Sequence, residues 1–258
     1  MLQRERDRRI IRALRVRGTA SAAELAGLLG VSAATIRRDL QRLDRDGALT
    51  RVYGGAVLDG GRVLDDGTVE APFEVSEDAE GRAKDSLAAL AVAELVRDGD
   101  VLLLDIGTTT LRVARHLRER DVTVITSSIA VFDELRDDPK VELVLLGGVV
   151  RRHYRSLVGT LTESALAQVS ADRLFLSCTG IRRDGQVLDN MQVEAAGKQA
   201  MIAAAESVVL VAPPSKFPGK GSLRICGLAD IDVLVTNEDA DQETVEICRQ
   251  AGGEVLTS

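Results

Sequence analysis

Residues 31–56 are VSAATIRRDLQRLDRDGALTRVYGGA, and their pattern predicts an amphipathic helix followed by a β-hairpin. Ser32 is suited to cap the start of this helix, because its hydroxyl can accept a hydrogen bond from a free backbone N–H. At 100° per residue, Ile36, Leu40 and Leu43 fall on one face of the helix. The opposite face is small and basic, with Ala34, Arg38, Gln41 and Arg45, flanked by Thr35 and Arg37. One face is therefore suited to packing, and the other is free to bind.

The segment before this helix predicts two more helices. Ile10 and Leu14 recur at helical spacing and indicate a first helix over roughly residues 3–17. Ser21 is a suitable N-cap for a short second helix, which ends at Gly30. Two helices joined by a tight turn, the second with small and basic residues at its exposed start, form the helix-turn-helix that enters the DNA major groove.

A hairpin is expected after the third helix. Residues 48–58 (ALTRVYGGAVL) hold two short β-prone runs around Gly54 and Gly55, which predict the wing of a winged helix-turn-helix. Arg51 and Tyr53 lie in this wing and are suited to contact the sugar-phosphate backbone. The residues expected to contact double-stranded DNA are Ser32, Ala34, Thr35, Arg37, Arg38, Gln41, Arg51 and Tyr53.

The charge of the chain is distributed unevenly. Residues 1–58 contain twelve arginines, no lysines and six acidic residues, so this part carries a net charge of +6. The whole chain carries −7, which leaves −13 on the remainder. A basic head on an acidic body concentrates attraction for phosphates at one end and disfavours nonspecific DNA contacts elsewhere.

The remainder of the chain predicts a linker and a second domain. Residues 59–80 are rich in glycine and acidic residues and show little periodicity, which is typical of a linker. From residue 81 onward, helical patterns alternate with apolar runs, and this alternation predicts an α/β domain with a parallel sheet covered on both faces. The expected strands are 101–105, 122–126, 141–146, 173–177, 207–212 and 232–236. We therefore expect a winged helix-turn-helix domain at 1–58, a linker at 59–80 and a sensor domain at 81–258.

Composition excludes several classes of protein. The charged start and the absence of an apolar run of about 20 residues indicate neither a signal peptide nor a membrane span, so we expect a cytoplasmic protein. The cysteines, Cys178, Cys226 and Cys248, are widely spaced, and the chain has only two histidines. Neither a disulfide framework nor a metal site is expected, and no cofactor is implied.

One segment of the second domain has the features of an anion site. Asp105-Ile106-Gly107-Thr108-Thr109-Thr110 follows a predicted strand and opens a helix. Free backbone N–H groups at a helix N-terminus and the positive end of the helix dipole favour a phosphate. Position alone equally allows that Thr108 or Thr109 only caps the helix.

Other strand ends carry similar residues. Ser127 follows one strand, Gly147 and Gly148 follow the next, and Arg152 lies just beyond. Ligands of open parallel sheets bind beyond the carboxyl ends of the strands, where these segments would converge. Each signal alone is weak, because Ser or Thr after a strand usually makes a turn and adjacent arginines usually lie at the surface.

Two lysines lie later in the chain. Lys198 stands four residues after Glu194 on a predicted helix, so an exposed salt bridge is the simpler interpretation. Lys216 follows a buried strand in Pro213-Pro214-Ser215-Lys216, which would present it at the same sheet edge.

The 31–56 stretch resembles the signature of the DeoR family of sugar-metabolism repressors, V-S-x-x-T-I-R-R-D-L, then L-x-x-x-G, then R-x-H-G-G-A. It departs only at Tyr53, where the family usually has histidine. The resemblance continues through DIGTTT, LLGG, VEAAGKQAMI and PSKF, in family order, over nearly the whole chain.

This resemblance implies a sensor domain with the fold shared by ribose-5-phosphate isomerase and CoA transferases, which binds a phosphorylated sugar or related metabolite. The effector contacts that it implies, with Ser127 added from its place after a strand, are Asp105, Gly107, Thr108, Thr109, Ser127, Gly147, Gly148, Arg152, Lys198 and Lys216.

Three departures concern the effector pocket. The family usually has Thr-Asn where this chain has Thr126-Ser127, and Asp before the glycine where it has Thr179-Gly180. It also has Ala-Asp-x-Ser-Lys where this chain has Pro213 in place of Asp. Two carboxylates that commonly accept hydrogen bonds from sugar hydroxyls are thus replaced, which favours a less hydroxylated or differently oriented effector, or altered sensing.

We therefore expect a DNA-binding transcription regulator that is not an enzyme: a repressor of a sugar or related metabolic operon, released from its operator by a phosphorylated metabolite. It is expected to form a homo-oligomer, a dimer or tetramer. The alternatives are a sugar-phosphate isomerase or transferase with a DNA-binding head, and an effector-independent DNA binder. The enzyme is disfavoured because the carboxylates suited to act as general base are among those replaced. Activation instead of repression remains open.

Overall fold

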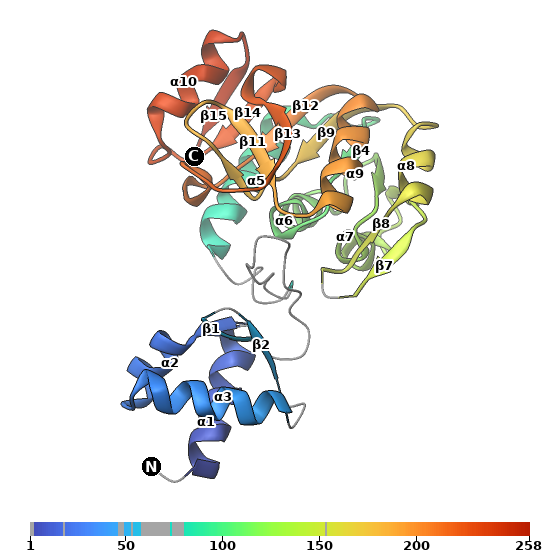
Figure 1. Ribbon diagram of the computed structural model, residues 1–258. Coiled ribbons are helices and arrows are strands. Elements are labelled where there is room, and N and C mark those ends of the chain that lie inside the picture. The colour runs from blue at the N-terminus through green and yellow to red at the C-terminus, as the bar shows by residue number, and fades with distance from the viewer. Residues whose placement is uncertain are drawn as a thin grey trace. The chain divides into compact units, whose positions relative to one another are not determined.

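The computed structural model describes residues 3–17, 19–45, 49–52, 54–57, 73, 80–152 and 154–258. These residues fall into two compact units, 1–79 and 80–258 (Figure 1), here called the head and the sensor domain. Most of the expected linker and the wing residue Tyr53 lie outside the described residues.

The head contains three helices and a small antiparallel sheet. Its elements are α1 (Gln3–Arg17), β1 (Thr19–Ser21), α2 (Ala22–Leu29), α3 (Ala33–Arg45), β2 (Thr50–Val52) and β3 (Gly55–Val57). The hairpin β2–β3 is the predicted wing, and β1 adds a third strand, in the order β1-β3-β2. The three-residue strand β1 was not predicted from the sequence.

The ends of α2 and α3 follow from their capping residues. Ser21 Oγ accepts a hydrogen bond from the Glu24 N–H, and the Glu24 carboxylate accepts one from the Ser21 N–H, which makes a reciprocal capping box. Gly30 ends α2 in the left-handed conformation with φ of 64°. Ser32 Oγ accepts from the Thr35 N–H at 3.1 Å and starts α3.

The sensor domain is built on a seven-stranded sheet in which every neighbouring pair of strands is parallel. The strand order is β15-β14-β12-β9-β4-β5-β6. The six predicted strands are all present, and β15 is additional. The bounds are β4 (Val101–Leu104), β5 (Val122–Thr126), β6 (Val141–Leu145), β9 (Ala171–Leu176), β12 (Ala205–Val211), β14 (Val233–Thr236) and β15 (Glu254–Thr257).

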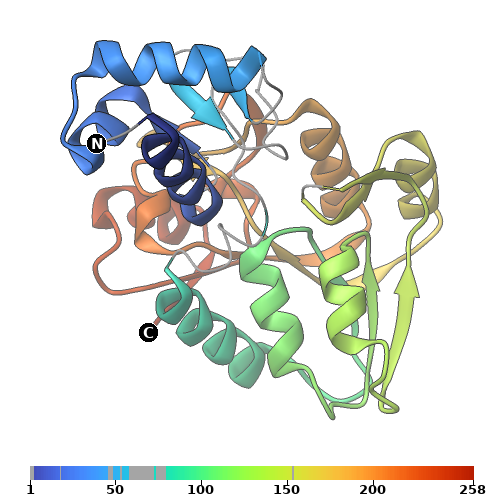
Figure 2. The ribbon, with the colours of Figure 1, turned by 90° about the horizontal axis from the view of Figure 1, so that it is seen from below.

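Helices cover both faces of this sheet. The face that includes Leu102 and Leu104 packs against α5 (Gly81–Leu95), α6 (Thr108–His116) and α7 (Ile129–Leu135), which lie side by side in Figure 2. The face that includes Leu103 packs against α8 (Thr160–Leu166), α9 (Gln192–Ala203) and α10 (Gln242–Gln250). Alternate residues of one strand thus enter opposite cores, and for this reason the strands are continuously apolar.

Two small antiparallel sheets complete the domain. One is the hairpin of β7 (Val149–Arg151) and β8 (Ser156–Val158). The other joins β10 (Gly180–Ile181), β11 (Gln186–Asp189) and β13 (Leu223–Gly227). Two short 3₁₀ helices are also present, η1 (Pro214–Lys216) and η2 (Leu228–Asp230).

The order of the strands creates a switch point beside β4. The chain runs from β4 to β5 and β6 on one side, and then returns to β9 on the other side of β4. The loops after β4 and β9 therefore separate at the carboxyl edge of the sheet, where open α/β sheets bind ligands. None of the described helices is long and apolar enough to cross a membrane.

Candidate nucleic-acid interface and effector site

The helix α3 has one buried and one exposed face, as the sequence predicted. Ile36, Leu40 and Leu43 are buried in the core of the head together with residues of α1 and α2. The opposite face is solvent-accessible. Of the predicted DNA contacts, Ser32, Ala34, Arg37, Arg38, Gln41 and Arg51 are exposed and Thr35 is half-buried, whereas Tyr53 lies outside the described residues.

The wing is attached to the end of α3 by a contact that the sequence did not reveal. Asp44 Oδ1 accepts a hydrogen bond of 2.9 Å from the backbone N–H of Arg51. This bond fixes the strand that carries Arg51 relative to the helix that carries Arg38. This hydrogen bond therefore links the part of the wing that carries Arg51 to the end of α3.

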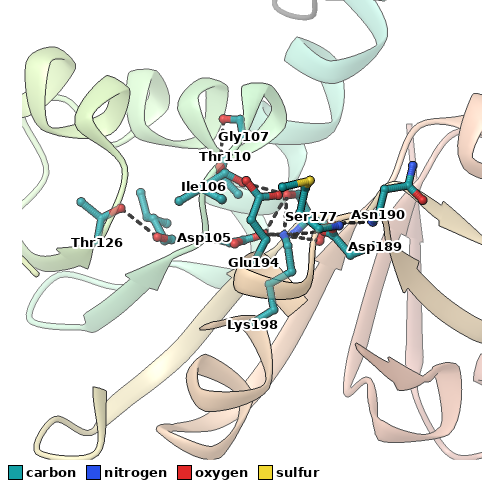
Figure 3. A network of polar contacts seen from close by, with 12 residues as sticks. Asp105, Ile106, Gly107, Thr110, Thr126, Ser177, Asp189, Asn190, Glu194 and Lys198 are labelled. Atoms are coloured by element: carbon teal, nitrogen blue, oxygen red, sulfur yellow. Dashed lines mark hydrogen bonds and ion pairs between the residues drawn. The ribbon is translucent and has the colours of Figure 1, made fainter. Parts of the chain in front are cut away.

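At the switch point of the sensor domain, Asp105, Ser177 and Lys198 form a buried polar network (Figure 3). Asp105 Oδ2 accepts hydrogen bonds from the Ser177 N–H at 2.9 Å and from Ser177 Oγ at 2.7 Å. Lys198 Nζ, supplied by α9, donates to Asp105 Oδ2 and to the Ser177 carbonyl oxygen at 3.0 Å. The simpler interpretation of Lys198, an exposed salt bridge with Glu194, is therefore wrong, because Lys198 is buried and pairs with Asp105.

A second carboxylate approaches the same lysine. Asp189 Oδ2 lies 3.8 Å from Lys198 Nζ, while Asp189 Oδ1 accepts hydrogen bonds from the N–H groups of Asn190 and Met191. Burial alone would lower the pKa of Lys198, but the negative charges of Asp105 and Asp189 outweigh it and raise that pKa above its ordinary value. Lys198 therefore stays protonated at neutral pH and is unsuited to act as a base.

The turn after β4 has the conformation expected of an anion site. Gly107 has φ of 126°, and a Cβ there would stand 3.1 Å from Ser177 Oγ, so the position requires glycine. Thr108 and Thr109 are buried in the first turn of α6. Thr108 Oγ1 accepts a hydrogen bond of 3.0 Å from Lys84 Nζ, and this lysine, on α5, is also buried.

Lys84 was missed in the sequence because it lies far upstream of the turn, on an alanine-rich helix where it stands among other charged residues such as Arg82 and Asp85. It brings a second buried cation to the Gly107–Thr109 turn.

A small pocket opens beside the Asp105 network. The pocket has room for about one water molecule in this structure, and the empty space around it, including the part open to solvent, is about 270 Å³. Asp105 Oδ1 is buried and has no hydrogen-bond partner among the described residues, so it is an acceptor that lacks a donor. The pocket is lined by Asp105, Ile106, Ser127, Leu157, Val158, Gly159, Thr162, Val193, Glu194, Gly197, Lys198 and Met201.

The β7–β8 hairpin places Arg151, and not Arg152, near this pocket. Arg151 forms an ion pair with Glu194, which lines the pocket, and lies over the ring of Tyr154 at 5.5 Å. The Tyr154 hydroxyl lies 3.9 Å from the position of a Cβ at Gly107. Arg152 is exposed.

The remaining predicted contacts lie around the same edge. The Gly147 carbonyl oxygen accepts a hydrogen bond from Thr162 Oγ1 of α8 at 2.7 Å. A Cβ at Gly148 would stand 2.9 Å from the Val158 nitrogen, so this glycine allows β8 to approach closely. Lys216 is half-buried on η1. Burial raises the pKa of the Cys178 thiol to about 11, and the charges of Lys216 and Lys198 partly oppose this rise.

The two parts define a class of protein. A helix-turn-helix head with an exposed basic helix face is joined to an α/β domain whose pocket holds fixed charges at its switch point. This combination is typical of a ligand-sensing transcription regulator.

Comparison with known proteins identifies the family. Residues 6–60 match the DeoR-like helix-turn-helix domain and residues 80–238 match the DeoR C terminal sensor domain. The chain belongs to the DeoR family of helix-turn-helix transcription regulators.

Several curated relatives match over nearly their whole length. A putative aga operon transcriptional repressor of Escherichia coli O157:H7 is 34% identical over 98% of this chain and 93% of its own length. The HTH-type transcriptional repressor GlcR of Bacillus subtilis is 31% identical over 100% and 97%. The L-fucose operon activator of Haemophilus influenzae is 28% identical over 95% and 96%.

Solved structures match only part of the chain. Ribose 5-phosphate isomerase A of Methanocaldococcus jannaschii is 19% identical with a TM-score of 0.40, covering 54% of this chain and 55% of the isomerase. A tetrameric eIF2B-beta2-delta2 complex of C. thermophilum gives 16% identity and a TM-score of 0.46, covering 66% of this chain and 61% of that one.

Proposed function

We propose that this protein represses a sugar or related metabolic operon and that a phosphorylated sugar or related metabolite releases it from its operator. The observation that carries the proposal is the buried Asp105–Lys198 pair beside the Gly107–Thr109 turn. The pair supplies fixed charges, and the start of α6 supplies backbone N–H groups for one small anion. The same chain also carries a DNA-binding head. The names of the relatives in Escherichia coli and Bacillus subtilis support repression.

Operator contacts are proposed on α3 and the wing. Arg37 and Arg38 are exposed on the face opposite the core, where each guanidinium can donate two hydrogen bonds to a guanine. Arg38→Ala is expected to lower operator affinity by about 1 to 3 kcal/mol. Unchanged affinity in Arg37→Ala and in Arg38→Ala, with folding intact, would contradict this assignment.

The effector is proposed to bind with its phosphate at Gly107–Thr109 and its hydroxyl-bearing end toward Asp105 Oδ1. Free N–H groups and the dipole at the start of α6 favour the phosphate, and Lys84 adds a buried positive charge there. Lys216 is proposed as a further cation that contacts the phosphate, and the exposed Arg152 is the alternative. The apolar side chains lining the pocket support a ligand with few hydroxyls.

Calorimetry with sugar phosphates and their unphosphorylated parents tests this placement. Thr108→Val and Lys216→Ala are expected to weaken binding of the phosphate selectively. Lys220→Ala is the matched control, because Lys220 is an exposed lysine of the same segment. The phosphate site is misplaced if a parent sugar binds as well as its phosphate, or if both pocket variants bind normally.

Self-association through the sensor domain is proposed as well, as a dimer or tetramer. One winged head buries too little surface for tight operator binding, so two heads are needed. The sheet ends at β6, where Val144 and Leu145 are partly exposed, and Val149 and Val150 of β7 are more exposed still. An apolar sheet edge of this kind favours pairing with a second copy.

Sedimentation of the full chain tests this proposal. Val149→Asp is expected to shift the equilibrium toward monomer. A wild-type monomer at micromolar concentration that still protects one uninterrupted short DNA site would contradict it.

A further inference from the structure

An aspartate occupies the middle of the reading helix. Asp39 follows Arg38 directly and lies one turn before Leu43. A carboxylate close to DNA phosphates opposes binding, because like charges repel. Its side chain, however, is only 6% exposed, at the border between the buried face and the DNA-facing face of α3. The structure therefore directs Asp39 away from solvent and toward α1.

The partners of Asp39 are two arginines. Arg6 of α1 donates from Nε to Asp39 Oδ2 at 2.5 Å and from Nη2 to Oδ1 at 3.1 Å, which is the two-pronged geometry of an arginine–carboxylate pair. Arg42 Nη2, one turn along α3, lies 3.7 Å from Asp39 Oδ1. Arg42 also donates to Asp7 at 2.5 Å. Two arginines and two aspartates thus join α1 to α3.

This four-residue cluster borders the apolar contact between the two helices. Arg6 lies one turn before Ile10 on α1, and Ile10 is packed in the same core as Ile36. Apolar packing is nondirectional and allows small rotations of a helix about its axis, whereas a two-pronged ion pair fixes the atoms that it joins. A rotation of α3 would move Arg38 relative to the base edges that it is expected to contact.

We propose that Asp39 is a positioning residue for operator recognition: it sets the rotation of α3 and keeps Arg6 in an internal pair, away from DNA phosphates. The inference rests on the proposed role of α3 as the reading helix. Asp39 then increases the sequence specificity of the head, although it lowers the total positive charge of the head.

Loss of the Asp39 carboxylate is expected to affect the affinities for nonspecific DNA and for the preferred sequence differently. Asp39→Asn raises the charge of the head by one and releases Arg6 from its two-pronged pair, while Arg42 keeps Asp7 as a partner, so affinity for nonspecific DNA is expected to stay constant or rise. Affinity for the preferred sequence is expected to fall, because Arg38 is no longer held in register. We expect the ratio of the two affinities to drop about tenfold, which is comparable to the loss of one base contact.

The probes are a duplex selected by the full-length protein from a random library and a scrambled duplex of the same composition. Glu24→Gln is the matched control, because it adds the same charge to the head, and glutamine can replace glutamate in the capping box with Ser21. The control is expected to raise both affinities by the same factor and to leave the ratio unchanged.

Three results would overturn the proposal. Asp39→Asn could raise both affinities as Glu24→Gln does, which would make Asp39 only a charge. It could lower both in proportion to the folded fraction measured by circular dichroism, which would make it only structural. Should Asp39→Asn not fold, Arg6→Lys carries the test, because it keeps the charge and removes the two-pronged pair. An unchanged ratio in Arg6→Lys would be the third such result.

Arg38→Ala distinguishes the positioning role of Asp39 from the proposed role of α3 as the reading helix, on which it rests. Suppose that Arg38→Ala loses its preference for the selected duplex, while Asp39→Asn and Arg6→Lys leave the ratio of the two affinities unchanged. These results refute the positioning role of Asp39 and leave the role of α3 intact. Unchanged preference in Arg37→Ala and in Arg38→Ala, with folding intact, refutes the role of α3 as the reading helix.

Discussion

Removal of the Lys198 ammonium is expected to destabilise the sensor domain strongly. Lys198 is 3% exposed and Asp105 is completely buried, so Lys198→Met leaves a carboxylate in the interior without its cation and close to Asp189. Breaking a buried ion pair by removing one partner costs about 3 to 5 kcal/mol. The double variant Asp105→Asn with Lys198→Met removes both charges and is expected to recover much of this loss.

Urea unfolding of the full chain at neutral pH, followed by circular dichroism, measures these free energies. The structure also sets their dependence on pH. Because the folded pKa of Lys198 is raised above its ordinary value of 10.5, the contribution of the pair is complete below that value. It is lost only as the pH rises above 10.5 and through the folded pKa.

Two results would refute this reasoning. One is a loss of less than about 1 kcal/mol in Lys198→Met, the value typical of exposed pairs. The other is a double variant that is no more stable than Lys198→Met, since the cost would then not come from the unpaired charge.

Three further predictions concern packing, the anion turn and a buried thiol. Ile36→Ala is expected to destabilise the head by about 2 to 5 kcal/mol, measured by thermal unfolding, because the side chain is completely buried; a loss under 1 kcal/mol would contradict its place in the core. Gly107→Ala is expected to weaken effector binding in calorimetry, because its Cβ would approach Ser177 Oγ; unchanged binding would exclude the turn from the site. Burial raises the pKa of Cys226 to about 12, so this buried thiol should not react with a disulfide reagent at pH 8 before unfolding; rapid labelling of Cys226 in the native protein would contradict this.

Much of the fold could be predicted because its signals are local and regular. The predicted strands are rich in apolar residues, as strands buried on both faces require. The edge strand β6 is the exception, because it contains Glu142 and partly exposes Val144 and Leu145. β15 was missed because Val255 and Leu256 are the only large apolar side chains in it. The β7–β8 hairpin was missed because its first strand exposes Val149 and Val150, and exposed apolar residues give no alternating pattern.

The site was predictable where one segment carries the chemistry and unpredictable where packing brings residues together. Asp105 could be found in its motif. Its pairing with Lys198 depends on how α9 packs on the sheet, and position on a helix had suggested Glu194 as the partner instead. The choice between Arg151 and Arg152 depends on which side of a two-stranded hairpin each residue faces. Lys84 reaches Thr108 only because α5 packs against α6.

The most direct test of the account measures operator affinity with and without effector. Fluorescence anisotropy of the full chain on its selected duplex is followed as sugar phosphates and their parent sugars are added singly. The account predicts that one class of phosphorylated compound weakens binding roughly 5- to 150-fold, which corresponds to a coupling of about 1 to 3 kcal/mol between the two domains. Unphosphorylated parents should have no effect. Affinity that stays constant with every sugar phosphate, or turnover of any of them, would contradict the account.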